Sequence, residues 1–150
     1  YCIANEEDAK DVFGIEADNT DINTGKLDRN GYISVAKKLT EKFGFKGVAI
    51  TLRESLSAND NNWSGMLFAN GEAHFSKKYA MHIVDRVGGG DSFGGGLIYS
   101  LVNGYDAQKA IEFAVAASCL KHSIEGDYNM VSVPEVEALA NGNASGRVQR

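Results

Sequence analysis

The stretch of this sequence best suited to chemistry is a glycine triplet followed by an acid, Gly88-Gly89-Gly90-Asp91. An apolar run over residues 81–84 precedes it, and apolar residues at helical spacing follow it. This pattern predicts a strand, a glycine loop and the start of a helix. Amides at a helix start are unpaired and lie at the positive end of the helix dipole, so they suit an anion such as phosphate.

Asp91 stands in the first turn of that predicted helix, where it would face the same ligand as the loop amides. A carboxylate that can accept a proton beside an anion-binding loop points to phosphoryl transfer. A second glycine triplet at residues 94–96 falls inside the helix, where each glycine costs roughly 1 kcal/mol relative to alanine. We therefore expect another element to approach this helix closely.

Other motifs for anion binding or catalysis fit less well. The sequence has no Gly-x-x-x-x-Gly-Lys-Ser/Thr loop, and Phe93 breaks the Gly-x-Gly-x-x-Gly pattern. Gly-x-Ser-x-Gly, the nucleophile elbow of serine hydrolases, does occur around Ser92, with Asp106 and His122 downstream in the required order. Both partners fall at predicted helix ends rather than after strands, so the hydrolase is the weaker alternative. The histidines and cysteines lack zinc-ligand spacing.

Several sequence motifs resemble those of a known protein family. The stretch from Asp85 to Phe93 resembles the C-terminal signature of ribokinase-like (PfkB-type) carbohydrate kinases, whose core is Gly-Ala-Gly-Asp. Other matches run in family order along the chain: Ala4-Asn5-Glu6-Glu7-Asp8 resembles an Asn-x-x-Glu motif, Thr51-Leu52-Arg53-Glu54 a Thr-Leu-Gly strand end, and Phe113-Ala114-Val115-Ala116-Ala117 with Gly126 a nucleotide-side helix and loop. In sequence, the segment Thr51-Leu52-Arg53-Glu54-Ser55 and the glycine motif are most similar to the corresponding segments of the bacterial 2-keto-3-deoxygluconate kinases.

The resemblance implies roles in the transfer of a phosphoryl group from ATP to a sugar hydroxyl. Asp91 would be the base and would bind the sugar, and the amides of Gly88, Gly89 and Gly90 would stabilise charge on the transferred group. Thr51 would face the ATP phosphates. Arg53 replaces a family glycine and would contact a phosphate or a sugar carboxylate, with a surface ion pair as the alternative.

The same resemblance implies cation and adenine sites. Asn5 and Asp8 would hold the water shell of Mg²⁺; the family has Glu where this chain has Asp8, so Glu7 is the alternative carboxylate. Asp85, Val87 and Gly126 would form a site for a monovalent cation such as K⁺. Val115 and Ser118 would lie near adenine.

Composition sets the broad class. The chain has 150 residues and a formal net charge of −5, which suits one domain and argues against nucleic-acid binding. It shows no apolar run of the roughly 18 residues that cross a membrane and no signal peptide, so the cytoplasm is the expected compartment. We expect Cys2 and Cys119 to be free thiols.

The elements that must position these residues follow from local signals. Asn5 and Ser132 are predicted helix N-caps, as is Asp106, while Asn70-Gly71 predicts a hairpin turn. The expected elements are helices at 6–13, 33–43, from the glycine loop to 102, 107–122 and from 133, strands at 48–52, 63–68 and 72–75, one or two strands over 77–84, and a loop at 15–30. We predict an α/β fold with a largely parallel sheet flanked by helices.

Members of the family are about twice this length. The resemblance implies that the chain is the C-terminal, nucleotide-side part of a ribokinase-like kinase domain, without the N-terminal half and its β-sheet lid. That half would then be its main partner, beside ATP and a sugar or sugar acid. We expect the edge at residues 1–4 to lie beside strand 48–52 and residues 83–84, and to promote self-association as a homo-oligomer. Three alternatives stay open: a fructose- or ribose-type kinase, a non-catalytic nucleotide-binding part, and the serine hydrolase.

Overall fold

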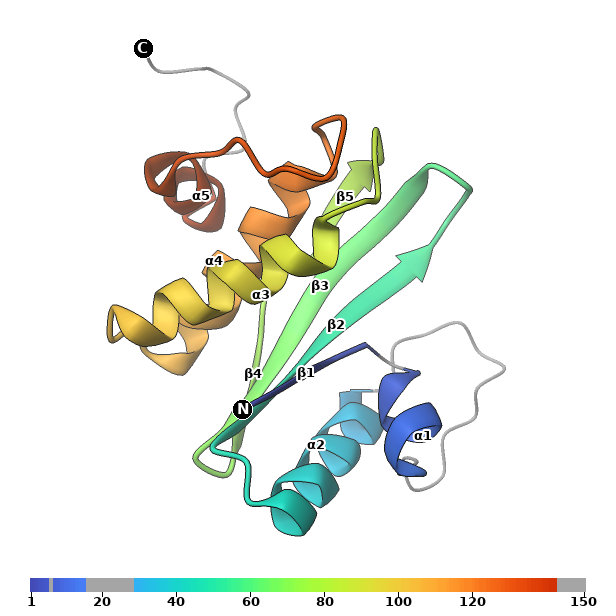
Figure 1. Ribbon diagram of the computed structural model, residues 1–150, viewed down its shortest axis with the longest axis vertical. Helices are drawn as coiled ribbons and strands as arrows, with labels where there is room; N and C mark the ends of the chain where they lie inside the picture. The colour runs from blue at the N-terminus through green and yellow to red at the C-terminus, as the bar shows by residue number, and fades with distance from the viewer. Residues whose placement is uncertain (6, 16–28, 143–150) are drawn as a thin grey trace.

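Five strands form a single sheet in the computed structural model, which describes residues 1–5, 7–15 and 29–142 (Figure 1). The strands pair in the order β1-β2-β3-β4, and β5 pairs with the first part of β3. Their bounds are β1 (Cys2–Ala4), β2 (Gly47–Ser55), β3 (Asp60–Ala69), β4 (Glu72–Phe75) and β5 (Tyr79–His82).

The strand directions differ from the expected largely parallel sheet. β1 and β2 are parallel, whereas β2–β3, β3–β4 and β3–β5 are antiparallel, so the described part of the sheet is mixed. The physical reason is that β2 and β3 are joined by a short turn and form one long hairpin, with Gly47 opposite Ala69 and Ser55 opposite Asn61. Consecutive strands can be parallel neighbours when a long crossover connects them, as between β1 and β2, and not when a short turn does.

Helices cover both faces of the sheet, as the α/β prediction required (Figure 1). On one face lie α1 (Asp8–Phe13) and α2 (Arg29–Phe43), whose apolar residues pack on β2 and β3. On the other face lie α3 (Gly89–Val102) and α4 (Ala107–Lys121), with α5 (Val133–Ala140) packed outside α4. Helix α2 begins at Arg29, earlier than expected, and most of the predicted loop lies outside the described residues.

Helix α3 meets α4 at unusually short range. A Cβ added at Gly96 would lie 3.0 Å from the Ala114 Cα and 3.2 Å from the Ala117 Cβ. The close approach inferred from the second glycine triplet is therefore confirmed at its last position. Small residues on both helices let the two backbones come together, which fixes the direction in which the start of α3 points.

Three local signals are confirmed in detail. The hairpin turn between β3 and β4 has φ of 52° at Asn70 and 83° at Gly71, the left-handed values that a tight turn requires. The Asp106 carboxylate accepts a hydrogen bond from the Lys109 amide at 2.8 Å and caps α4. Ser132 and Glu135 form a reciprocal capping box at the start of α5.

The first strand, β1, lies at one edge of the described sheet. Cys2 is opposite Val48 and Ala4 opposite Ile50, as expected for a strand beside β2. Residues 83 and 84 do not join the sheet, which corrects that part of the prediction; the Val84 amide instead donates to the His122 carbonyl at 2.8 Å. Both cysteines are free thiols. No helix in the described part of the chain is long and apolar enough to cross a membrane.

Candidate active site

A cleft of about 420 Å³ opens where β1 ends, beside the middle of β2 and the start of α3. Because β1 and β2 are parallel, the residues that follow β1 come to lie next to β2. The cleft therefore collects side chains from distant parts of the sequence. Its lining comprises Ile3, Ala4, Asn5, Asp8, Thr51, Arg53, Trp63, Arg86, Gly90, Phe93 and His122. Five of these, Asn5, Asp8, Thr51, Arg53 and Gly90, are predicted site residues.

Two of the three loop glycines are required by packing. Gly88 has φ of 78°, and a Cβ there would lie 2.1 Å from the Asp127 carbonyl oxygen. A Cβ at Gly89 would lie 2.5 Å from the His122 ring. At Gly90, by contrast, a Cβ would meet no atom within 4 Å. Gly88 and Gly89 are therefore fixed by their surroundings, whereas Gly90 lies open in the cleft wall.

The loop amides differ in what they are free to bind. The Gly89 amide donates to the Arg86 carbonyl at 3.2 Å, and the Gly88 carbonyl accepts from the Ser92 amide at 2.9 Å. No described residue accepts a hydrogen bond from the amides of Gly88 or Gly90. Unpaired donors at a helix start suit a negatively charged group. Of the three amides predicted to bind an anion, Gly89 is thus already committed within the loop.

Asp91 is exposed in the first turn of α3. Its carboxylate makes no hydrogen bond or ion pair with any residue that the structure describes, so it remains available to accept a proton. Ser92, the nucleophile of the alternative hydrolase, is buried inside the helix. The supposed acid, Asp106, caps α4, and the supposed base, His122, bonds through Nδ1 to the Ser118 carbonyl at 2.7 Å. A Ser-His-Asp arrangement is therefore not assembled.

The acidic start of α1 forms a closed set of hydrogen bonds. The Asn5 Oδ1 accepts from the amides of Glu7 at 2.7 Å and Asp8 at 2.9 Å, while the Asp8 Oδ2 accepts from the Asn5 amide at 2.8 Å. This reciprocal pair explains why a helix begins here. Asn5 and Asp8 line the cleft, whereas Glu7 is exposed outside its lining. Among the described residues there is no group of three or more His, Cys, Asp or Glu that could hold a metal.

The residues predicted to bind a monovalent cation do come together. The Asp85 carboxylate accepts from the Val87 amide at 3.0 Å and from the Gly126 amide at 2.8 Å, which links the glycine loop to the loop after α4. These two N–H groups, above all that of Val87, hold the pKa of Asp85 below its usual value; the nearby Lys121 charge also contributes. The carboxylate thus binds N–H donors from the positions expected to surround a cation.

Val115 and Ser118 are the residues predicted to lie near adenine. Both are fully buried in α4. Val115 packs in the core against Gly65, and the Ser118 hydroxyl donates to the Gly89 carbonyl at 2.8 Å. The reason is that this face of α4 lies against the sheet and the glycine loop. Ser118 therefore supports the glycine loop from below.

Six residues of the cleft lining were not assigned to the phosphoryl-transfer site from the sequence, and three of them, Trp63, Arg86 and His122, carry polar side-chain groups. The His122 ring is buried and lies 5.1 Å from the Trp63 ring between centroids, and burial lowers its pKa from the usual 6.5. No local spacing signals this pair, because one residue comes from β3 and the other follows α4. Arg86 lies inside the glycine motif, and its position there was a signal for a charged group near the anion site.

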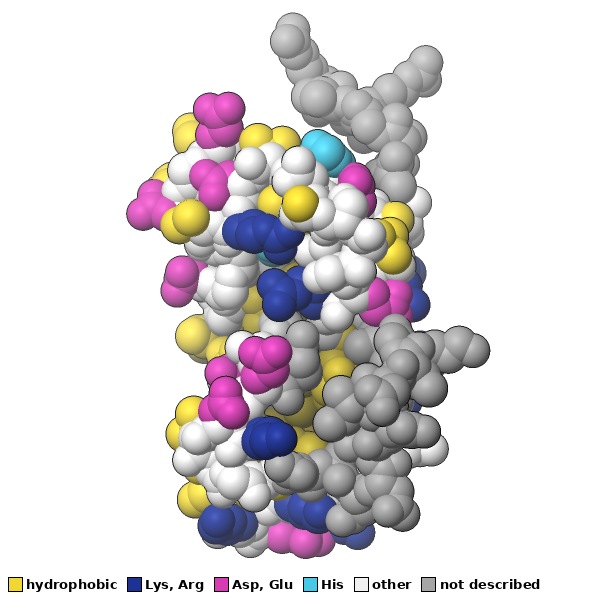
Figure 2. Space-filling view, turned by 90° about the vertical axis from the view of Figure 1, so that its right-hand side faces the viewer, with side chains coloured by type: hydrophobic (Ala, Val, Ile, Leu, Met, Phe, Trp, Pro, Cys, Tyr) yellow, Lys and Arg dark blue, Asp and Glu magenta, His cyan; other side chains and the backbone are white. Residues whose placement is uncertain are grey.

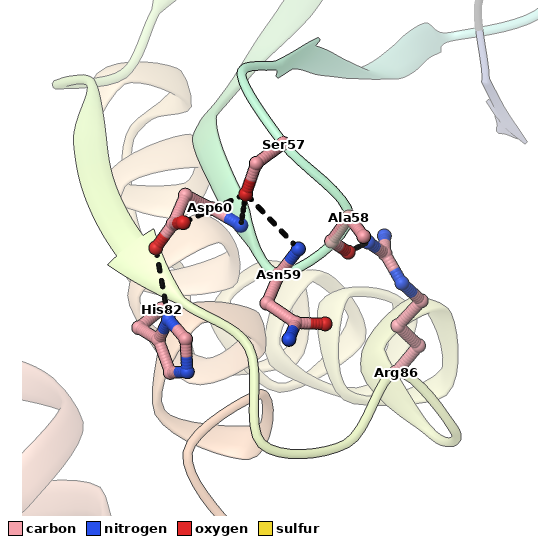
Figure 3. A network of polar contacts seen from close by, with 6 residues as sticks. All are labelled: Ser57, Ala58, Asn59, Asp60, His82 and Arg86. Carbon is pink, nitrogen blue, oxygen red and sulfur yellow. Dashed lines mark hydrogen bonds and ion pairs between the residues drawn. The ribbon is translucent and has the colours of Figure 1, made fainter.

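Arg86 is held by the turn between β2 and β3 (Figure 3). Its guanidinium donates to the Ala58 carbonyl, and to the Asn61 side-chain oxygen at 3.1 Å in the amide orientation that satisfies both polar atoms of Asn61. The turn itself is braced by Asp60, which accepts from Ser57 at 2.7 Å and contacts His82 at 2.8 Å. Hydrogen bonds from His82 and then Ser57 lower the pKa of Asp60.

Positive charge gathers at the cleft. Arg53 and Arg86 both line it, with Asp8 as the only acid in its lining. Figure 2 shows Lys and Arg side chains in the middle of one face of the molecule, above acidic side chains. The cleft lining therefore combines two guanidinium groups with the unpaired amide of Gly90. The exposed carboxylate of Asp91 follows Gly90 in the chain but is not part of the lining. Such a set of groups suits a ligand that carries phosphate and a hydroxyl group.

Comparison with known proteins gives the family. The model of the pfkB family carbohydrate kinases matches residues 1–134. The chain is 54% identical to the 2-dehydro-3-deoxygluconokinase of Thermotoga maritima, with a TM-score of 0.86 over 93% of this chain and 40% of that one. It is 31% identical to a PfkB family carbohydrate kinase of Listeria grayi, with a TM-score of 0.79 over 94% of this chain and 41% of that one.

A curated relative, the 2-dehydro-3-deoxygalactonokinase of Haloferax volcanii, is 27% identical over 114 residues, which are 75% of this chain and 33% of the relative. The chain thus spans between a third and about two fifths of the length of the proteins that it matches. The match of the family model covers most of the chain and includes both the Asn5 and the Asp91 motifs. The chain belongs to the pfkB family of carbohydrate kinases.

Proposed function

We propose that this chain is the C-terminal, nucleotide-side part of a kinase domain that transfers a phosphoryl group from ATP to a sugar hydroxyl. One observation carries the proposal: Asp91 offers an exposed carboxylate without a described partner, directly after the open amide of Gly90 in the cleft wall. Phosphoryl transfer needs a positioned base and stabilisation of charge on the transferred group, and these two residues meet both requirements.

Each loop residue has a distinct part in the proposal. Asp91 takes the proton from the attacking hydroxyl and thereby also binds the sugar. The amides of Gly88 and Gly90 stabilise charge on the transferred phosphoryl group. Gly89 contributes through position, because its amide is bonded to Arg86 and its Cα lies against His122.

The opposite wall of the cleft is assigned to the phosphates of ATP and to Mg²⁺. Thr51 would contact the phosphates from β2, and Arg53, on the same strand, would contact either a phosphate or a sugar carboxylate. Asp8 and Asn5 fit a magnesium ion that keeps most of its waters, because a single carboxylate in the cleft suits such binding. When bound, the ion neutralises phosphate charge. Asp8 is preferred to Glu7 because only Asp8 lines the cleft.

The substrate we favour is 2-keto-3-deoxygluconate. The 54% identity to the Thermotoga maritima 2-dehydro-3-deoxygluconokinase supports it, and Arg53 offers a cation that could pair with a sugar carboxylate. A coupled assay with ketodeoxy sugar acids, fructose and ribose tests the assignment. A site that pairs a carboxylate rejects sugars that leave its cation unpaired. A preference for fructose or ribose would refute this substrate and leave the kinase assignment intact.

The reaction itself is tested by a pair of neighbouring substitutions in the intact kinase. Asp91→Asn should leave ATP binding nearly unchanged and lower kcat at least about 100-fold, since general-base catalysis contributes roughly 10²–10⁴. Ser92→Ala is the matched control and should change kcat far less. Loss of activity in the serine variant alone would instead favour the hydrolase.

The domain assignment has its own test. β1 pairs on one side only within the described sheet, and Tyr1 and Ile3 are 56% and 44% exposed. We propose that this edge receives the rest of the kinase domain, and that the 150-residue chain alone associates through it. Light scattering and calorimetric titration with ATP test this. A stable monomer that binds ATP would identify an autonomous nucleotide-binding domain.

A further inference from the structure

Lys121, the last residue of α4, has no solvent exposure. Its Nζ donates to the Ile124 carbonyl at 2.9 Å, and its Cε lies 3.2 Å from the position that a Cβ would take at Gly88. A lysine is almost never fully buried unless its charge is compensated. The ammonium group therefore belongs to the support of the glycine loop, beneath the residues assigned to phosphoryl transfer.

Two loops close around this ammonium group. One is the glycine loop, where Asp85 and Gly88 lie; the other follows α4 and contains Ile124, Gly126 and Asp127. The loops are tied together because the Asp85 carboxylate accepts from the Gly126 amide and the Asp127 carbonyl faces Gly88. Lys121 also lies near enough to Asp85 for its charge to favour the ionised carboxylate. The buried ammonium group thus donates to a carbonyl oxygen and lies near a carboxylate.

Asp85, Val87 and Gly126 are the residues for which a K⁺ site was expected, and the contacts of the Asp85 carboxylate do not suit a metal ion. Potassium needs several oxygen ligands, whereas Val87 and Gly126 direct N–H groups at Asp85. The positive charge for this place is already present on a side chain. We propose that the Lys121 ammonium group takes the place of a monovalent cation beneath the glycine loop, so that this protein needs no K⁺ there.

In this arrangement Lys121 is a positioning residue. It touches no substrate, but it holds the loop after α4 against Gly88 and so keeps the unpaired loop amides in place. A covalently attached cation is always present, whereas a bound ion depends on the salt concentration. The inference rests on the geometry of the two loops and does not require the proposed substrate or base.

The test measures thermal unfolding of the whole chain in chloride salts of K⁺, Na⁺ and tetramethylammonium at equal ionic strength. For the unmodified chain we expect the same Tm in all three salts. Lys121→Met removes the charge and keeps most of the volume, so K⁺ should now raise Tm by about 3–6 °C over tetramethylammonium at a tenfold excess over its Kd. Lys109→Met, on the exposed side of the same helix, is the matched control and should show no K⁺-specific rise.

A K⁺-specific rise in the unmodified chain would overturn the proposal, as would a folded Lys121→Met chain that responds to no cation. If that variant does not fold, Lys121→Ala refolded with n-propylammonium, which replaces the missing atoms, gives the answer. Recovery with n-propylammonium, and not with tetramethylammonium, supports an internal cation. Failure to recover shows that the lysine serves only as packing and refutes the idea.

Discussion

Substitutions of single glycines in the loop distinguish the effect of each glycine on stability from its effect on phosphoryl transfer. Gly88→Ala places a methyl group where φ is 78° and where the Asp127 carbonyl oxygen lies 2.1 Å away. The left-handed conformation costs about 1–2 kcal/mol for a residue with a Cβ, and overpacking typically adds 1–3 kcal/mol. The two terms predict a loss of about 2–5 kcal/mol, or roughly 5–15 °C in Tm for a chain of this size.

The control lies two residues away. At Gly90 an added Cβ meets nothing within 4 Å, so Gly90→Ala should keep Tm within about 2 °C of the unmodified chain. It should still weaken phosphoryl transfer, because Gly90 lines the cleft and its methyl group would crowd the ligand. Denaturant and thermal unfolding measure the first effect, and the sugar kinase assay the second. Equal stability of the two variants would refute the reasoning, as would full activity of Gly90→Ala.

Three further results are expected. Gly96→Ala should destabilise the chain, because the new Cβ would lie only 3.0 Å from the Ala114 Cα. Gly95 is exposed, so Gly95→Ala should instead stabilise the chain by about 1 kcal/mol. Urea unfolding of both variants checks this. Burial lowers the pKa of His122, so the folded state favours the neutral ring, and stability should decline as pH falls below the usual 6.5. A His122→Gln chain with an unchanged acid profile would contradict this. Ser132→Ala removes a capping box and should cost about 1 kcal/mol in the same unfolding measurement, with no change if the cap is dispensable.

Features set by short segments were predicted well from the sequence. The Asn70-Gly71 turn and the caps at Asp106 and Ser132 each depend on residues at most three positions apart, and the structure confirms all three. The glycine loop followed by a helix start was equally accessible, because the change from apolar run to glycines to helical spacing lies within about twenty residues.

The β2–β3 hairpin was harder to predict. Its turn end is polar, and residues 53–62 lie outside the strands that were expected at 48–52 and 63–68. The strands continue because pairing across the hairpin compensates for the polar sequence: the Asn62 side chain donates to Glu54 at 2.8 Å, and Lys78 adds an ion pair to the same carboxylate at 2.7 Å. Such cross-strand partners are not visible until the register is known. Without this hairpin, the sequence suggested parallel strands.

The candidate site, like the fold, was predicted from the sequence only where its residues lie close together in the chain. The motif identified Asp91 and the glycines, but the residues that shape the loop come from the end of α4, some thirty positions later. His122 excludes a side chain at Gly89, the Asp127 carbonyl excludes one at Gly88, and Lys121 fills the space beneath. Two glycines that read as ligand contacts in the sequence are therefore also demanded by packing. Only Gly90 has no packing reason to lack a side chain, and this makes it the glycine whose presence most directly indicates a bound ligand.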